Sequence, residues 1–186
     1  LALFLLPKVS IVSKQPVISC EFFPPKTEKG AQNLLLVQER LAVLKPEFYS
    51  VTFGAGGSTQ DNTLEAVIAI QQRAKETGID AAPHLSCVGS SKERIRTILQ
   101  TYIDNGISRV VALRGDLPSG MRDPGDFRYA NELVQFIRKE TNDHFTIEVA
   151  AYPEVYPQAQ DAGVDLENFK RKVDAGADSA ITQYFF

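Results

Sequence analysis

The sequence has little of what several specialised classes of protein need. It contains two cysteines, Cys20 and Cys87, in 186 residues. Because they form no CxxC pair and no disulfide framework, we expect a protein of a reducing compartment, the cytoplasm. The net charge of −3 gives no electrostatic reason to expect a nucleic-acid partner.

Long apolar runs and targeting signals are also scarce. The opening LALFLL is too short to span a bilayer, and it lacks the basic flank and cleavage site of a signal peptide. We therefore expect no membrane partner. The length and composition predict one globular domain over residues 1–186, in which 1–16 form an N-terminal extension. The chain begins with Leu1 rather than Met, so we expect that further residues precede it.

What the sequence does contain is a repeated alternation of strand-like and helix-like segments. The β-rich runs predict strands near 17–23, 47–53, 80–85, 108–114, 146–151 and 179–184. Helical periodicity predicts helices near 31–44, 60–77, 91–104, 126–141 and 166–175. Ser90 and Glu93 fit a capping box, and three helices are followed by glycines that can end them: Gly78, Gly106 and Gly176. This alternation predicts parallel strands joined by right-handed crossovers.

One polar residue stands near the end of each predicted strand: Glu21, Thr52, His84, Asp116, Tyr152 and Gln183. Their separations, by subtraction, are 31, 32, 32, 36 and 31 residues. Each unit therefore delivers one polar group to the same rim, which is the layout of an active site in a (β/α)8 barrel.

Strand alternation, counted from these rim residues, also predicts which side chains face the barrel interior. The inward residues are mostly small: Ser19, Ser50, Ala82, Ala112, Ala150 and Ile181. The outward residues are large: Ile18, Phe22, Val51, Leu85, Val111, Leu113 and Val149. Glu148 falls on the interior side, where the pattern assigns it no role.

The alternative for such an alternation is a doubly wound open sheet. That fold predicts a glycine-rich phosphate loop after the first strand, but here the first strand ends in FFPPK. Neither GxGxxG nor GxxxxGK[ST] occurs, and GAGG at 54–57 lacks the Rossmann spacing. We therefore predict an α/β fold, a (β/α)8 TIM barrel with about six of its eight βα units present. Two further units are expected beyond residue 186, so the first and sixth strands would have open edges.

Glu21 is the sharpest candidate for chemistry, since a carboxylate in an apolar run is costly unless it is paired, solvated or protonated. The FFPP that follows it would exclude water, raise its pKa and make it a general acid. The alternatives are a carboxylate paired with a nearby arginine and one that is solvated at the rim.

The segment ALRGDLP at 112–118 places Arg114 and Asp116 on one side of a strand end. Gly115 between them would let a ligand approach the backbone closely. The RGD triplet also occurs in cell-adhesion loops, but that role needs an exposed loop in a secreted protein. An internal ion pair between Arg114 and Asp116 is the other alternative.

The residues that other barrel chemistries need are missing. His84 has no second histidine or cysteine at ligand spacing, which argues against a zinc site. The strand ends carry too few carboxylates for another divalent metal, so we expect no metal. No predicted strand supplies an inward lysine, which argues against a Schiff-base aldolase.

The predicted helix near 166–175 carries two stripes. An apolar stripe, expected to be buried, consists of Leu166, Phe169 and Val173. A polar edge beside it contains Asp165, Asn168, Arg171 and Lys172. This edge is either an ordinary solvated face or a grip for a ribose and a pyrophosphate.

Six motifs together resemble the methylenetetrahydrofolate reductase family: EFFPPKT, SVTFGAGGSTQD, AAPHLSC, ALRGDLP, AAYPEVYPQA and FKRKVDAGADSAITQYFF. The resemblance runs from about residue 17 to the last residue. It implies a flavoprotein barrel of one-carbon metabolism and methionine biosynthesis that reduces 5,10-methylenetetrahydrofolate to 5-methyltetrahydrofolate. It further implies noncovalent FAD, NADH or NADPH as electron donor, a small-molecule folate substrate, and a homo-oligomer when the protein is full length.

The resemblance also implies roles for individual residues. Glu21 would protonate the folate so that its five-membered ring opens to an iminium, which then accepts hydride from the reduced flavin. Asp116 would tune flavin and pterin, and Gln183 would contact the folate. The positions that match flavin contacts are Thr52, Phe53, Ala55, His84, Arg114, Gly115, Asp116, Ala130, Tyr152, Asp165, Asn168, Arg171 and Lys172. Tyr156 departs from the histidine that is common in bacterial relatives, although its hydroxyl can still donate a hydrogen bond.

Two other functions remain open from the sequence. One is a noncatalytic flavin- or folate-binding fragment of such an enzyme. The other is a different barrel enzyme, such as a pterin-binding transferase, which would contain no flavin.

Overall fold

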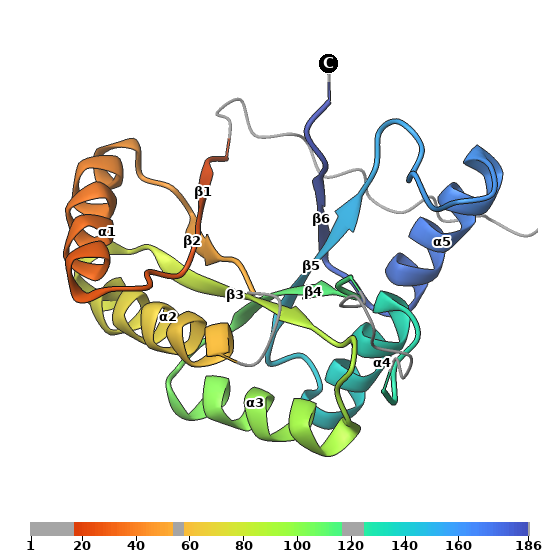
Figure 1. Cartoon of the computed structure of the whole chain (residues 1–186), viewed down its shortest axis with the longest axis horizontal. Coiled ribbons are helices and arrows are strands. Elements are labelled where there is room, and N and C mark those ends of the chain that lie inside the picture. Colours follow the sequence, from red (N-terminus) through yellow and green to blue (C-terminus); the bar gives the residue numbers. More distant parts are fainter. Residues whose placement is uncertain (1–16, 54–57, 117–124, 186) are drawn as a thin grey trace, which may run out of the picture.

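The computed structural model describes residues 17–53, 58–116 and 125–185. Within them, six strands form one parallel sheet whose spatial order follows the chain, from β1 to β6. The strands are β1 (Ser19–Phe22), β2 (Phe48–Val51), β3 (Asp80–Ser86), β4 (Arg109–Leu113), β5 (Thr146–Ala151) and β6 (Ser179–Thr182). The sheet curls, and the helices surround its outer side (Figure 1).

The connections between strands are helical. The helices are α1 (Glu28–Leu41), the 3-10 turn η1 (Ala42–Leu44), α2 (Ser58–Thr77), α3 (Lys92–Asp104), α4 (Ala130–Thr141) and α5 (Ala162–Asp174). The first helix begins three residues earlier than predicted, because Thr27 caps it by accepting a hydrogen bond from the Gly30 amide at 3.1 Å. None of the helices in the described ranges is long and apolar enough to cross a bilayer.

The strand order confirms the predicted fold class. A doubly wound sheet reverses its strand order at a switch point and has helices on both faces. Here the order does not reverse, and the helices cover the outer face alone (Figure 1). The described chain is therefore a partial (β/α)8 barrel, with β1 and β6 as its edge strands.

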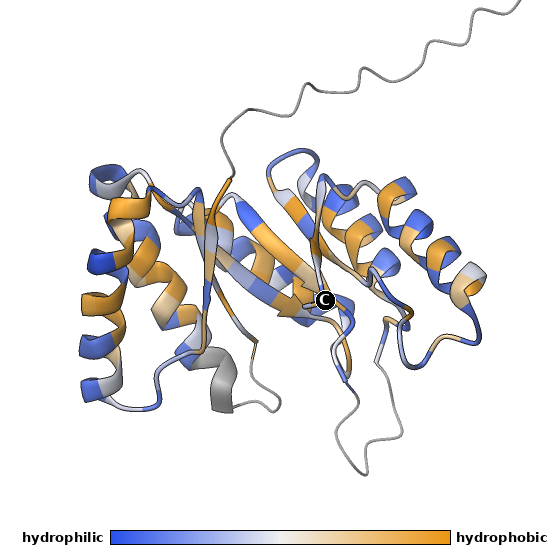
Figure 2. Cartoon of the chain, turned by 90° about the horizontal axis from the view of Figure 1, so that it is seen from above, coloured by the Kyte–Doolittle hydropathy of each residue, from blue (hydrophilic) through white to orange (hydrophobic). Residues whose placement is uncertain are grey.

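The main core lies between the sheet and the helices. Val51, Leu85 and Val149 face outward from the strands, as predicted, and pack with Leu99 and Ile137 of the helices. Figure 2 shows apolar residues along the strands and alternating apolar and hydrophilic residues along the helices. A smaller cluster fills the inner face, where it contains Phe48, Ala82, Val111, Leu113 and Ile181. The interior is therefore bulkier than the sequence pattern predicted.

The predicted facing of β4 is wrong. Val111 and Leu113 pack in the interior cluster, whereas Ala112 packs under the helices. The prediction counted the two-residue alternation back from Asp116. Gly115 has a φ of +82°, so the alternation of an extended strand does not continue through it.

The capping box predicted at Ser90 is also displaced. Ser91 is the N-cap of α3, and its hydroxyl accepts a hydrogen bond from the Arg94 amide at 3.2 Å. Ser90 is buried, and its amide donates to the Cys87 carbonyl at 3.1 Å. The three helix-ending glycines have the predicted positive φ: Gly78 (+70°), Gly106 (+73°) and Gly176 (+108°).

The apolar stripe predicted on α5 is buried only at its centre. Phe169 packs against the core, but Leu166 and Val173 are exposed. This helix contacts α4 on one flank, and within the described residues no further helix follows it. The periodicity of α5 predicts which residues share a face. Whether Leu166 and Val173 on that face are buried depends on what packs against it.

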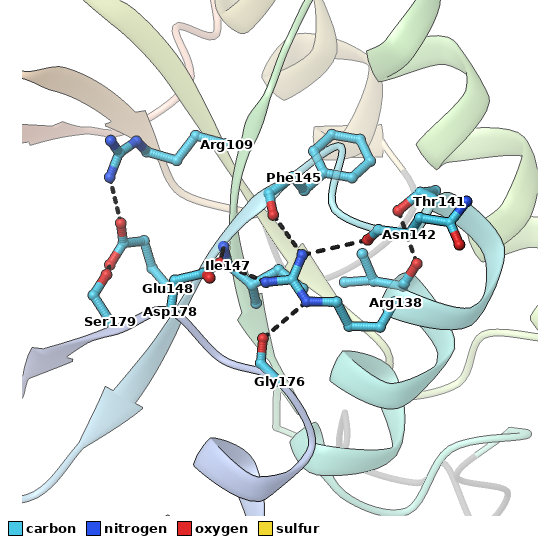
Figure 3. Close-up of polar contacts among 11 residues, drawn as sticks. Arg109, Arg138, Thr141, Asn142, Phe145, Ile147, Glu148, Gly176, Asp178 and Ser179 are labelled. Carbon is cyan, nitrogen blue, oxygen red and sulfur yellow. Dashed lines mark hydrogen bonds and ion pairs between the residues drawn. The ribbon is translucent and has the colours of Figure 1, made fainter. Parts of the chain in front are cut away.

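Glu148 has a structural role in a polar network near the amino ends of the strands. Its side chain is 4% exposed, and one carboxylate oxygen lies 2.5 Å from an Arg109 nitrogen. The other oxygen accepts a hydrogen bond from Ser179 (Figure 3). Arg109 also contacts Glu47 and lies over the Phe48 ring, 4.5 Å from its centroid. A buried carboxylate needs such partners to offset its desolvation.

A second arginine, Arg138, links the turns that precede β5 and β6. The guanidinium of Arg138, on α4, donates to the carbonyls of Gly176 at 2.9 Å and Phe145 at 2.6 Å (Figure 3). It also pairs with Asp178 at 2.5 Å, and the same carboxylate oxygen accepts from the Ile147 amide at 2.6 Å. These contacts join the turns that lead into β5 and β6.

Candidate active site

The six polar residues predicted at strand ends do share one edge of the sheet. Glu21 and His84 lie within β1 and β3, near their carboxyl ends, and the other four come after their strands: Thr52, Tyr152 and Gln183 directly, and Asp116 three residues beyond the end of β4. Two of these four extend the strand ladder by one hydrogen bond. The Thr52 amide donates to Phe22, and the Gln183 amide to Ala151, at 2.9 and 2.8 Å.

Glu21 meets His84 inside this rim. Both side chains point to the interior, and Glu21 Oε2 lies 3.1 Å from His84 Nε2. The His84 side chain is 10% exposed, and its buried Nε2 forms no hydrogen bond of regular geometry in the described chain, the contact with Glu21 included. The carboxylate is therefore the one polar neighbour within reach of this buried nitrogen among those residues.

The predicted rise in the pKa of Glu21 is wrong for this structure. The contact with His84 lowers the pKa of the Glu21 carboxyl, and this effect exceeds the opposing effect of burial. The expected apolar wall is absent, because Phe22 turns outward against Tyr49 and Phe23 is 81% exposed. The Glu21 side chain itself is 53% exposed.

Arg114 does not pair with Asp116. Its guanidinium donates to the Gln158 side chain at 3.2 Å and to the Gly115 carbonyl at 3.1 Å. Asp116 is exposed, and within the described residues no ion pair joins it to Arg114. The internal ion pair is therefore not the arrangement seen.

Position 115 needs a glycine because of close neighbours at and just after the end of β3, as well as because of its positive φ. A Cβ at this position would lie 2.0 Å from Ser86 Oγ and 2.9 Å from a Val88 methyl carbon. Ser86 Oγ in turn donates to the Arg114 carbonyl at 3.0 Å, which anchors the end of β4. The glycine thus lets two strand ends approach closely at the rim.

We expect Gly115→Ala to lower the free energy of unfolding more than Gly78→Ala. Both glycines have similar φ, +82° and +70°, but a Cβ at Gly78 meets nothing within 4 Å. Gly78→Ala should therefore cost about 1–2 kcal/mol for the left-handed backbone alone. Gly115→Ala should add about 1–3 kcal/mol of steric strain. Urea unfolding of the two variants measures the difference, and equal losses would contradict the close approach to Ser86.

The end of β5 is joined to α5 through several predicted site residues. The rings of Tyr152 and Tyr156 lie 4.7 Å apart, and the Tyr156 amide donates to Asp165 at 3.1 Å. Lys172 donates to the Ala150 carbonyl. Burial lowers the pKa of Lys172, and Asp165 opposes this effect; burial also raises the pKa of Tyr152. The polar edge of α5 therefore reaches the rim through Lys172.

Arg171 and Asn168 lie apart from this group. Arg171 contacts Asn168 at 3.4 Å and Glu167 at 3.6 Å, on an exposed part of α5. The two cations of the polar edge therefore point in different directions: Lys172 contacts β5, and Arg171 is exposed to solvent. Of the remaining predicted positions, Ala130 begins α4, Phe53 is half-buried just after β2, and Ala55 lies outside the described residues.

The sequence reasoning missed two residues that hold the site. Gln158 contacts Arg114 across the rim, and Ser86 holds the end of β4. Ser86 carried a detectable signal, since it follows His84 by two residues in a strand, although it extends to β4 rather than to the rim. Gln158 lies between β5 and α5 and carried no such signal.

Two grooves on the described surface lie away from the rim. Grooves of about 670 Å³ occur between α1 and α2 and between α3 and α4, and neither is lined by a predicted site residue. The rim is instead where the predicted polar residues gather, at the carboxyl ends of the strands. Chemical character rather than enclosure therefore identifies it as the candidate site.

Comparison with known proteins finds relatives that match most of the chain. The family model for methylenetetrahydrofolate reductase matches residues 8–186. The 5,10-methylenetetrahydrofolate reductases of Salmonella typhimurium and Escherichia coli K12 are each 50% identical over 175 residues, which cover 94% of this chain and 57% of theirs. Maize methylenetetrahydrofolate reductase (NADH) 1 is 42% identical over 181 residues, covering 90% of this chain and 30% of its own. The chain thus spans little more than half the length of the bacterial relatives.

Solved structures with the same fold include aldolases of low sequence similarity. The aldolase QR15 aligns with a TM-score of 0.57 at 14% identity, over 92% of this chain and 70% of its own. A putative deoxyribose-phosphate aldolase from Coccidioides immitis aligns at 0.56 and 14% identity, over 90% and 59%. At this identity they show a shared fold and carry no information about activity.

Proposed function

The chain belongs to the methylenetetrahydrofolate reductase family, and on that premise we propose that the intact protein reduces 5,10-methylenetetrahydrofolate to 5-methyltetrahydrofolate. NADH or NADPH would supply the electrons through bound FAD. The observation that carries the proposal is the 50% identity over 94% of the chain, together with a carboxyl group on the inner rim. We further propose a homo-oligomeric, cytoplasmic enzyme.

Glu21 is the proton donor in this proposal. Its carboxyl group faces the barrel interior at the carboxyl edge and is exposed enough to contact a ligand. In its neutral form it gives its proton to a ring nitrogen of the folate, and the adjacent carbon–nitrogen bond breaks to leave an electrophilic iminium carbon. Because the pKa of Glu21 is lowered in the ligand-free chain, the carboxylate must take up a proton before this step.

The cations of the rim fit an anionic cofactor such as FAD. Arg114 and Lys172 come from different units, and within the described residues neither forms an ion pair with a carboxylate. Their hydrogen-bond partners are neutral groups, so their charge remains available to a pyrophosphate. FAD, when bound, carries hydride from the nicotinamide to the folate. Tyr152 and Asp165 lie beside these cations, where they can contact the rest of the cofactor.

A spectrum of the purified intact protein tests the proposal. We expect an absorbance band at about 450 nm from oxidised flavin, which bleaches when NADH or NADPH is added without oxygen. Adding methylenetetrahydrofolate should then restore the band. A colourless protein would contradict the proposal and favour a flavin-free barrel enzyme, such as a pterin-binding transferase. A yellow protein whose reduced flavin is not reoxidised by methylenetetrahydrofolate would indicate a noncatalytic flavin-binding role.

A further inference from the structure

The contact between His84 and Glu21 joins a buried ring to an exposed carboxylate. His84 lies in the middle of the described sheet, on β3, between β2 and β4. Its side chain is 10% exposed, so the ring has little freedom to move. The Glu21 side chain is 53% exposed in the described chain, so without a partner it would sample several rotamers.

We propose that His84 is the positioning residue for Glu21: its Nε2–H holds the carboxylate in the inward rotamer and sets the pH range in which this group donates a proton. The proposal rests on the function proposed above, since it concerns how the acid of that reaction is held.

The geometry favours this role over a purely structural one. Nε2 is a buried polar atom whose one reachable partner in the described chain is Glu21 Oε2, at 3.1 Å. A structural histidine in a barrel interior would satisfy this nitrogen with the backbone or with a buried side chain. Here the nitrogen lies 3.1 Å from the group that the reaction needs.

No other charged group competes for the carboxylate in the described part of the chain. On β2, the residue paired with Glu21 is Ser50, and on β4 Val111 and Leu113 face inward. Arg109, at the amino end of β4 on the same face, is paired with Glu47 and Glu148. The remaining titratable residue of β1, Cys20, faces the helices. His84 is therefore the only described titratable group that shifts the pKa of Glu21.

The direction of the effect follows from the charge of the acceptor. A donor to a carboxylate stabilises its ionised form, so removing the donor raises the pKa of the carboxyl group. The protonated form is the one that donates to the folate, so the rate of that step falls as pH rises through this pKa. Without His84, the fall must occur at higher pH.

The test is the pH dependence of the folate step in the intact enzyme, measured in single turnovers after the flavin has been reduced. We expect His84→Leu to lower the rate on its low-pH plateau by about 10–100-fold, as for a misplaced catalytic group. The high-pH limb should move to higher pH. His84→Gln, which keeps a side-chain N–H, should recover part of the rate and lie between the two profiles. Ser50→Ala, a change on the same inner face, should leave the profile of the native enzyme unchanged.

An unmoved high-pH limb in the His84→Leu and His84→Gln enzymes would overturn the proposal, even if both are slower. If His84→Leu does not fold, the proposal is tested on His84→Gln alone, by its pH profile and by infrared titration of Glu21. The carboxylate infrared band assigned by Glu21→Gln, titrated with and without His84→Gln, should show protonation at higher pH in the variant. Equal titrations would also overturn the proposal. Native enzyme that is colourless or inactive with folate would instead overturn the proposed function.

Discussion

Glu21→Gln should slow reduction of methylenetetrahydrofolate by about 10²–10⁴-fold, the usual contribution of a general acid. Glutamine has nearly the same shape and can still contact His84, but it has no proton to give to a ring nitrogen. The flavin should still accept electrons from NADH or NADPH, because that step needs no acid at this position. The two half-reactions are measured separately, by anaerobic bleaching and by reoxidation with the folate.

Glu65→Gln is the matched control for this charge change. Glu65 is an exposed residue of α2 that lies in the groove between α1 and α2, away from the rim. Both half-reactions should keep their native rates in that variant. If folate reduction in Glu21→Gln stays within a few-fold of the native rate, Glu21 is not the acid.

Arg109→Met should lower the free energy of unfolding by about 3–5 kcal/mol, the typical cost of breaking a buried ion pair. The change leaves the Glu148 carboxylate, 4% exposed, with Ser179 as its remaining described partner. It also removes the cation that lies over the Phe48 ring. Urea unfolding of the intact protein measures the loss.

Two further variants separate the ion pair from general damage. Arg109→Met combined with Glu148→Met removes both charges, so most of the lost stability should return. Arg96→Met breaks ion pairs with Glu93 and Glu140 on the helix surface and should cost much less than Arg109→Met, because solvent screens exposed pairs. A double variant as unstable as Arg109→Met alone would show that the buried network does not act through its charges.

Much of the fold followed from local patterns. Apolar alternation located all six strands, and the helix-ending glycines have the expected left-handed backbone because that requirement is local. The exceptions occur where a distant contact decides. The side chains of β4 face the opposite way from the prediction because Gly115, which lies close to Ser86, has a positive φ. The N-cap of α3 is Ser91 rather than the predicted Ser90. Neither contact leaves a periodic signal.

By itself, the sequence determined the order of the elements, the barrel class, and the set of polar residues at the rim, since each depends on spacing along the chain. Only the tertiary structure decided that Glu21 meets His84 and that its pKa is lowered rather than raised. The physical reason is that a carboxyl group responds to its solvation and its partners. The solvation of Glu21 depends on Phe23, which is exposed rather than packed over it. Its partner is the ring of His84, which lies two strands away on β3.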